Sequence, residues 1–317
     1  MGVANSNALR EGTRVLDYQI GSVLGSGGFG ITYQARDLEL DSVVAIKEYF
    51  PAALAMRMAD QTVASRPDGT QGGFAWGLDK FIDEAIALAQ MRHSNIVVVN
   101  DRFNGNGTAY MALEFVDGPT LKTWLHSIKR VPEQEELDLL LWPLLSALEA
   151  VHAKGLLHRD VAPKNIMIDR DFKPVLIDFG AARQLVAERS QTFAAVLTPG
   201  YAPLEQYVAS AHRQGPWTDI YSLAATFYEA IAGQPPPEAP ARAQEDPCTP
   251  AVDLGRGRYR QDFLQALDWG LKPLSKDRPQ SVAALRRALH ATPQQVRGLS
   301  TARGNGKSWI GGWFGRS

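Results

Sequence analysis

The spacing of apolar residues changes along this chain, and that change constrains the fold more than any other feature of the sequence. From Val15 to about residue 115, apolar and aromatic residues alternate with polar ones in short runs, a pattern typical of β-strands, and one helical pattern covers 77–93. After Asp117 and Gly118 the apolar residues recur at helical spacing. The predicted helices cover residues 133–153, 218–232, 260–272 and 280–291. We therefore predict an α+β protein, with a sheet and one helix followed by a larger, mostly helical part. Thr218 is expected to cap its helix.

Composition excludes several classes of protein. A chain of 317 residues suggests two domains or one large two-lobed domain. Its 33 basic and 34 acidic residues give a net charge of −1, so nothing points to nucleic acid as a partner. The single cysteine, Cys248, excludes an intramolecular disulfide and fits a reducing compartment. No apolar run reaches the roughly 20 residues of a membrane span. We expect a cytoplasmic chain without a transmembrane segment, either by itself or as part of a longer or membrane-associated protein.

Three segments are expected to lie outside the regular elements. Residues 1–14 and 293–317 are predicted to be a disordered start and a flexible tail, and residues 51–75 a long inserted loop. The opening residues MGVANS fit the N-myristoylation pattern at Gly2, which we interpret as a chance match.

The sequence GSGGFG places three glycines, Gly25, Gly27 and Gly30, in the pattern G-x-G-x-x-G. In a dinucleotide-binding fold a helix would follow the third glycine. Here the residues after Gly30 alternate as a strand does, so the loop is predicted to join two strands in a hairpin. Such a loop lets backbone N–H groups approach phosphate oxygens without a clash from Cβ atoms. A flexible hairpin without a ligand is the alternative.

Lys47 ends the apolar strand VVAIK. A lysine that points inward from such a strand needs an anionic partner, and Glu84 in the next helix is the natural candidate. The pair would form a positive clamp for phosphate whose position the helix controls. A solvated lysine at the end of a strand is the alternative.

The stretch HRDVAPKN at 158–165 and the IDFG that follows it supply two acids and an amide close together in the sequence. Asn165 and Asp178 carry the hard oxygen ligands that Mg²⁺ prefers. Asp160 remains to accept a hydroxyl proton or to orient the hydroxyl, and Lys164 to neutralise charge on a transferring group. Metal, positioning and charge compensation are what phosphoryl transfer requires.

These motifs, in this order, resemble the eukaryotic-type protein kinase family, and the resemblance covers roughly residues 15–292. The glycine loop, VAIK, HRD, DFG and TPGYAPLEQY each match, and AIKEYFP and TPGYAPLEQY are most similar to bacterial serine/threonine kinases. The resemblance implies a bilobal fold, with a small antiparallel sheet and one helix in an N-lobe (15–116) and a mostly helical C-lobe (117–292). It also implies ATP with Mg²⁺ or Mn²⁺, and protein substrates.

The resemblance implies a role for each matching residue. Asp160, Lys164, Lys47 and Glu84 would be catalytic, and Asn165 and Asp178 would hold the metal. Leu113 would be the gatekeeper, and Glu205 would pair with Arg278 while Asp219 anchors the catalytic loop. The residues expected to surround the nucleotide are Gly25, Gly27, Gly28, Phe29, Gly30, Thr32, Ala45, Lys47, Leu113, Glu114, Val116 and Met167.

Two positions depart from the family. Thr32 stands where valine is usual, which adds a hydroxyl next to the adenine. Ala162 stands where serine/threonine kinases carry lysine, and the cation is instead Lys164, at the spacing of the tyrosine-kinase arginine. Thr198, by contrast, resembles the serine/threonine class. We give Thr198 more weight and predict transfer to Ser and Thr hydroxyls.

Regulation and alternatives complete the sequence-based expectations. Ser190 or Thr192 is predicted to be autophosphorylated, because a dianion opposite Arg159 would order the loop, and a transient dimer would allow this. One alternative is a pseudokinase that binds nucleotide as a scaffold. Another is a small-molecule kinase of similar fold, which would not need TPGYAPLEQ, Asp219 or Arg278.

Overall fold

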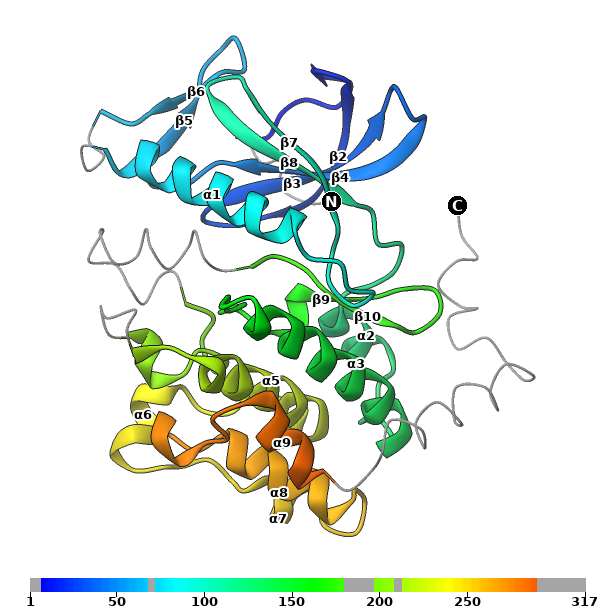
Figure 1. Ribbon diagram of the computed structural model, residues 1–317, viewed down its shortest axis with the longest axis vertical. Helices are drawn as coiled ribbons and strands as arrows, with labels where there is room; N and C mark the ends of the chain where they lie inside the picture. Colours follow the sequence, from blue (N-terminus) through cyan, green and yellow to red (C-terminus); the bar gives the residue numbers. More distant parts are fainter. Residues whose placement is uncertain (1–6, 68–71, 180–196, 208–212, 290–317) are drawn as a thin grey trace. The chain divides into compact units, whose positions relative to one another are not determined.

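The computed structural model describes residues 7–67, 72–179, 197–207 and 213–289 (Figure 1). The chain divides into two compact units. The first unit comprises Met1–Arg92, Ile96–Phe115 and Phe179–Val196. The second unit comprises His93–Asn95, Val116–Asp178 and Leu197–Ser317.

The first unit is built on a six-stranded antiparallel sheet with the strand order β1-β2-β3-β4-β8-β7. Its strands are β1 (Arg14–Val15), β2 (Tyr18–Ser26), β3 (Gly30–Asp37), β4 (Ser42–Tyr49), β7 (Val99–Gly105) and β8 (Thr108–Glu114). The helix α1 (Gly73–Ala89) packs against β7 and β8 (Figure 1). The predicted sheet with one helix is confirmed.

Strand β4 shows why both faces of this sheet are buried. Successive side chains on a strand point to opposite faces. Tyr49 faces α1, with its ring centroid 5.6 Å from that of Phe81. Ile46 belongs to the apolar cluster of the other face, together with Tyr33 and Ile20. The strand therefore reads as almost continuously apolar, and Lys47 and Glu48 interrupt it on opposite faces.

Two sequence-based expectations for the first unit are wrong. The segment 51–75 is not simply a loop, because it contains a two-stranded hairpin, β5 (Ala55–Arg57) and β6 (Val63–Ser65), and the start of α1. The described residues 7–14 are not disordered, since Leu9 is only 3% exposed and packs in the core. Both segments are held by partners distant in sequence, which apolar periodicity does not reveal.

The second unit is mostly helical, as predicted. Its helices are α2 (Leu121–Ser127), α3 (Gln134–Ala153), α5 (Pro216–Ala232), α6 (Ala239–Gln244), α7 (Ala251–Leu254), α8 (Gln261–Gly270) and α9 (Val282–Ala288). The hairpin of β9 (Ile166–Ile168) and β10 (Pro174–Leu176) and the 3-10 turns η1 (Pro163–Asn165), η3 (Leu204–Tyr207) and η5 (Ser275–Asp277) complete it. None of the helices described is long and apolar enough to cross a bilayer. The α+β class is confirmed, although α2, α6, α7 and β9 were not predicted.

The start of α5 differs from the prediction. The helix begins at Pro216 and its N-cap is Gly215, so Thr218 is the third helical residue and not the cap. The Thr218 hydroxyl still accepts a hydrogen bond from the Gly215 N–H, at 3.2 Å. It donates to Glu205, at 3.0 Å, and so joins the helix start to the turn η3.

Candidate active site

Five of the residues predicted to surround a nucleotide share one face of the first unit's sheet. Thr32 lies opposite both Gly25 in β2 and Lys47 in β4. Ala45 lies opposite Leu113 in β8. Directly opposed residues of antiparallel strands have their side chains on the same face, and residues two apart on one strand do as well. The sheet therefore gathers side chains that are far apart in the sequence.

The predicted pair of Lys47 and Glu84 is present on this face. The Lys47 Nζ lies 3.5 Å from a Glu84 carboxylate oxygen, and the two side chains are 16% and 3% exposed. Glu84 lies on the buried face of α1, where its charge needs a partner. Lys47 Nζ also lies 5.7 Å from the centroid of the Phe81 ring. The lysine is held by α1 but keeps some access to solvent.

The glycine loop joins β2 to β3 as a hairpin, as predicted from the strand pattern after Gly30. The Gly27 N–H donates to the Gly30 carbonyl at 2.9 Å and closes the turn. A Cβ at Gly30 would lie 2.6 Å from the Glu48 carbonyl oxygen, so a side chain does not fit there. A Cβ at Gly25, Gly27 or Gly28 would meet nothing within 4 Å. The tip of the loop is therefore open to an approaching group.

In the second unit, Asp160 is the centre of the polar cluster that HRDVAPKN forms. Its carboxylate accepts a hydrogen bond from the Thr198 hydroxyl and one from the Asn165 amide, both at 2.6 Å. The Asn165 amide also donates to the Asp160 backbone carbonyl, at 2.9 Å. Asp160 is 7% exposed, so these donors fix the orientation of an otherwise buried carboxylate.

Lys164 reaches the same cluster from the turn η1. Its Nζ donates to the Thr198 hydroxyl at 3.0 Å and lies 3.6 Å from Asp160. The lysine side chain is 44% exposed, so it can also meet a group arriving from solvent. The cation four residues after Asp160 thus shares Thr198 with that acid, although Ala162 occupies the position two residues after it.

Asn165 and Asp178 fit a divalent cation by the chemistry of their donors. Because the Asn165 amide nitrogen donates to Asp160, its oxygen is the atom that would meet a cation. The Ile177 N–H donates to the Asn165 carbonyl at 3.0 Å, which fixes Asp178 next to it in the chain. Among the residues described, no group of three or more histidine, cysteine or acidic side chains could hold a metal. A pair of oxygen donors suits Mg²⁺, which takes its other ligands from phosphates and water.

Asp219 supports this cluster from within the protein. Its carboxylate accepts from the N–H groups of His158 and Arg159, at 2.9 and 2.7 Å, and contacts His152 at 2.8 Å. Burial alone would raise the pKa of Asp219, but the hydrogen bond and charge of His152 and the backbone donors hold that pKa below its ordinary value. Arg159 has a φ of 67°, an uncommon conformation that these bonds maintain. The predicted anchoring role of Asp219 is confirmed. The part played by His152 was missed, and only its place in the last turn of α3 hinted at it.

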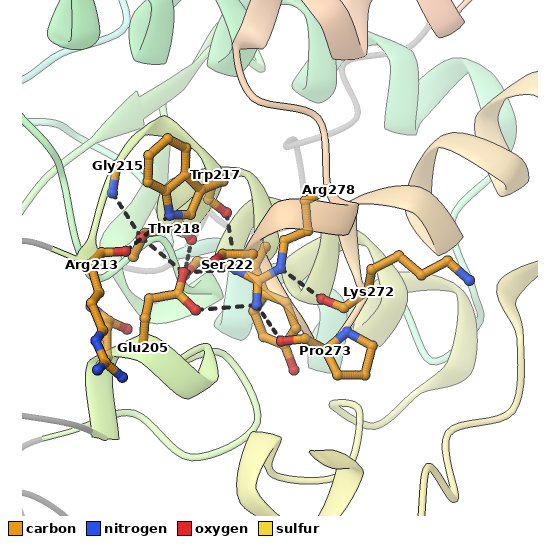
Figure 2. A network of polar contacts seen from close by, with 12 residues as sticks. Glu205, Arg213, Gly215, Trp217, Thr218, Ser222, Lys272, Pro273 and Arg278 are labelled. Carbon is orange, nitrogen blue, oxygen red and sulfur yellow. Dashed lines mark hydrogen bonds and ion pairs between the residues drawn. The ribbon is translucent and has the colours of Figure 1, made fainter.

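Glu205 and Arg278 form the predicted ion pair, shown in Figure 2. The Arg278 guanidinium donates to both carboxylate oxygens, at 2.7 and 3.2 Å, and its side chain is fully buried. It also donates to the backbone carbonyls of Lys272 and Pro273 (Figure 2). The pair links the turn η3, which follows Thr198, to the segment before α9.

The remaining predicted residues lie at identifiable places. Glu114 ends β8 and its N–H donates to the Val98 carbonyl at 2.9 Å, in the first unit. Val116 and Met167 belong to the second unit, where Met167 lies in β9. Ser190 and Thr192 lie outside the described residues, as does Gly2.

Comparison with known proteins gives consistent matches to protein kinases. Residues 18–249 match the protein kinase domain family. The serine/threonine-protein kinase PknB of Mycolicibacterium smegmatis is 32% identical over 287 residues, which cover 85% of this chain and 42% of PknB. The serine/threonine-protein kinase PknA of Mycobacterium tuberculosis is 32% identical over 225 residues, which cover 69% of this chain and 47% of PknA. The chain therefore spans less than half the length of these relatives.

Solved structures show the same likeness. The apo form of PpkA-294 is 38% identical and superposes with a TM-score of 0.82, covering 90% of this chain and all of PpkA-294. The PknI kinase domain of Mycobacterium tuberculosis is 24% identical, with a TM-score of 0.65. The match covers 89% of this chain and 98% of the PknI chain. At that identity PknI supports the fold alone.

Proposed function

Because this chain belongs to the protein kinase family, we propose that it transfers the γ-phosphate of ATP to serine and threonine hydroxyls of proteins. The observation that carries the proposal is the contact of Thr198 with both Asp160 and Lys164. Asp160 can accept a proton, Lys164 carries a positive charge, and Thr198 is the loop residue expected to face the substrate hydroxyl. These three side chains meet at one point. Of the two conflicting sequence cues, this geometry supports the serine/threonine one, and the named relatives agree.

In this proposal the first unit binds the nucleotide. The open tip of the glycine loop, from Gly25 to Gly30, lets backbone N–H groups approach the phosphates. Lys47, oriented by Glu84, neutralises charge on the α- and β-phosphates. The adenine contacts Ala45 and Thr32 by their side chains and Glu114 by its backbone, with Leu113 as the gatekeeper. Phe29 covers the phosphates from the loop tip.

The second unit supplies the groups for transfer. Asp160 accepts the proton of the acceptor hydroxyl, and its bonds to Thr198 and Asn165 keep the carboxylate aimed. Lys164 compensates negative charge on the transferring phosphoryl group. Asn165 and Asp178 would hold Mg²⁺ or Mn²⁺, which would supply positive charge to offset the negative charge of the phosphates. Val116 and Met167 are the residues of this unit that we propose for adenine binding.

The test is phosphate transfer from labelled ATP, with the protein itself and a generic basic protein as acceptors. Asp160→Asn should lower the rate by about 10²–10⁴ while leaving the thermal stability and ATP binding nearly unchanged. Asp178→Asn should instead weaken Mg²⁺ binding, so that a higher Mg²⁺ concentration is needed for half-maximal activity. ATP binding by the wild type without any transfer would establish a nucleotide-binding scaffold and overturn the proposal.

We further propose that the chain phosphorylates itself in a transient dimer. Arg159 directly precedes Asp160, so a phosphate that pairs with Arg159 would add to the contacts that hold this segment. Peptide mapping of active protein should find phosphate on Ser190 or Thr192. Active protein without a modified residue at either position would contradict this.

A further inference from the structure

In the connection between β4 and α1, the described residues 50–67 are fastened to the sheet by a buried ion pair. Arg57, at the end of β5, donates through both terminal nitrogens to Glu48 of β4, at 2.8 and 2.6 Å. The two side chains are 5% and 0% exposed. A fork of two parallel bonds fixes direction as well as distance. The hairpin β5–β6 is thereby tied to the strand that carries Lys47.

Glu48 receives two further hydrogen bonds within the sheet. The hydroxyls of Tyr33 and Tyr110 donate to its two oxygens, at 2.8 and 2.9 Å. Burial, and then the charge of Glu48, raise the pKa of both tyrosines, so both phenols stay protonated and donate. The carboxylate thus accepts four hydrogen bonds, one each from β3 and β8 and two from Arg57 of the hairpin. Its position is strongly determined.

Arg57 uses its remaining donors on two other segments. Its Nε and one terminal nitrogen donate to the Asn7 carbonyl, at 2.9 and 2.8 Å, and the other terminal nitrogen donates to the Gln61 carbonyl at 3.2 Å. The guanidinium also lies 5.0 Å from the centroid of the Phe50 ring. These bonds account for all five N–H groups of an arginine. Lysine could not replace that geometry.

The connection between β4 and α1 also holds the glycine loop. The N–H of Phe50 donates to the Phe29 carbonyl and that of Ala52 to the Gly28 carbonyl, both at 3.1 Å. On the other side, the Val63 N–H donates to the Asn106 carbonyl in the turn between β7 and β8, at 2.7 Å. This connection therefore contacts the glycine loop directly and Lys47 through its neighbour.

We propose that Arg57 is a positioning residue for ATP, which it serves by holding Glu48 and, through β4, Lys47 and the glycine loop. This inference rests on the proposed function. Glu48 and Lys47 are adjacent and point to opposite faces of one strand, so a fixed Glu48 limits where the Lys47 ammonium can lie. A connection that looks like a surface insertion is then part of the nucleotide site.

The experiment compares Arg57→Met with wild type in steady-state kinetics, at a temperature well below the melting temperature of both proteins. The expected result is a fall of about 10- to 100-fold in kcat/KM for ATP, because small displacements of phosphate ligands are costly. The KM for the protein acceptor should not change. The affinity of Arg57→Met for ATP, measured separately by calorimetry, should fall together with its kcat/KM for ATP.

Two further variants separate positioning from stability. Arg66→Ala is the matched control, since Arg66 follows the same hairpin and, among the described residues, its side chain donates to the carbonyls of Ala52 and Ala55 and not to Glu48. It should leave kcat/KM for ATP unchanged. The double variant Glu48→Gln/Arg57→Met removes both buried charges. Its melting temperature should therefore return toward that of wild type, while its kcat/KM for ATP should stay low.

Each outcome bears on one claim. If the double variant regains both stability and ATP affinity, Arg57 is structural only and the inference fails. If Arg57→Met keeps wild-type affinity and kcat/KM for ATP, the inference fails while the proposed function stands. If the wild type itself neither binds ATP nor transfers phosphate, the proposed function fails first.

Discussion

At the scale of single residues, the cation next to Asp160 shows what spacing alone leaves undecided. Sequence motifs predicted that Lys164 would be close to the acid, but not whether it would meet Thr198. The structure gives both contacts, at 3.0 Å to the Thr198 hydroxyl and 3.6 Å to Asp160. An ammonium on a flexible stem can reach a common point from more than one backbone position. Lys164 can therefore reach both Thr198 and Asp160 although position 162 is an alanine.

This reading predicts the effect of moving the charge. Lys164→Ala should lower kcat by on the order of 10², as the loss of one transition-state donor does, and leave the KM for ATP little changed. Lys164→Ala combined with Ala162→Lys should regain part of kcat. Labelled-phosphate transfer to a basic protein measures both.

The control for that experiment is Lys122→Ala, a lysine on an exposed position of α2 in the same unit. It should leave kcat at the wild-type value. A double variant as slow as Lys164→Ala would mean that the position of the cation matters and not only its charge.

At the scale of elements, the periodicity of apolar residues predicted the helices and strands that bury an apolar face. It missed the elements that are held by single polar contacts. Strands β2, β3 and β4 and helices α3 and α8 were predicted because their apolar residues repeat at the right spacing. The hairpin β5–β6 was not, because it is tied to the sheet by an arginine whose partner lies nine residues earlier on a buried face. A connection rich in Ala, Gly, Asp and Arg has the composition of a solvated loop. In the same way, α1 starts before its predicted first residue, Gly77, where no apolar pattern marks the boundary.

The ion pair of Glu205 with Arg278 predicts how the elements of the second unit depend on one buried contact. Arg278→Met should lower the free energy of unfolding by about 3–5 kcal/mol, because it leaves Glu205 charged and buried. Adding Glu205→Gln should restore most of the loss, since no unpaired charge then remains and the glutamine oxygen can still accept from Thr218. Urea unfolding measures the three proteins.

An exposed pair of the same kind serves as the comparison. Arg256 and Asp253 are 77% and 51% exposed, so Arg256→Ala should change the free energy of unfolding by about 0–1 kcal/mol. If Arg278→Met costs no more than that, the buried pair does not hold these elements together.

At the scale of the whole molecule, the pH dependence of stability just below neutrality should depend on buried groups whose pKa values change on folding. His158 is fully buried, and burial holds its pKa below the ordinary value near 6.5. Its Nδ1 accepts from the Asp160 N–H, at 3.3 Å, and its Nε2 faces the Ile177 carbonyl, at 3.1 Å. One nitrogen accepts and the other donates, which is the pattern of a neutral ring. Burial lowers the pKa of His93 as well.

These pKa values predict the direction of the pH dependence. Below pH 6.5 the unfolded chain binds protons at His158 and His93 while the folded chain does not, so stability falls as the pH falls. Above about pH 7 neither state binds them and the contribution is constant. Asp219, whose pKa is also lowered by folding, adds its own loss only below its ordinary pKa of 3.8. The melting temperature should therefore be level from pH 8 to 7 and fall from pH 6.5 to 5, before the acid range of Asp219 is reached.

The variant His158→Phe tests whether the His158 imidazole causes the loss of melting temperature below pH 6.5. Phenylalanine fills a similar volume without a titrating nitrogen, so the variant should be less stable at pH 8 but lose less melting temperature between pH 6.5 and 5. Calorimetric melting in buffers of equal ionic strength measures both proteins. A wild-type melting temperature that stays level down to pH 5 would contradict the neutral, buried His158. If the melting temperature of His158→Phe falls as steeply as that of wild type between pH 6.5 and 5, the loss of stability is due to His93 and not to His158. Because His158 directly precedes the segment that holds Asp160, this loss should be accompanied by a loss of transfer activity at temperatures close to melting.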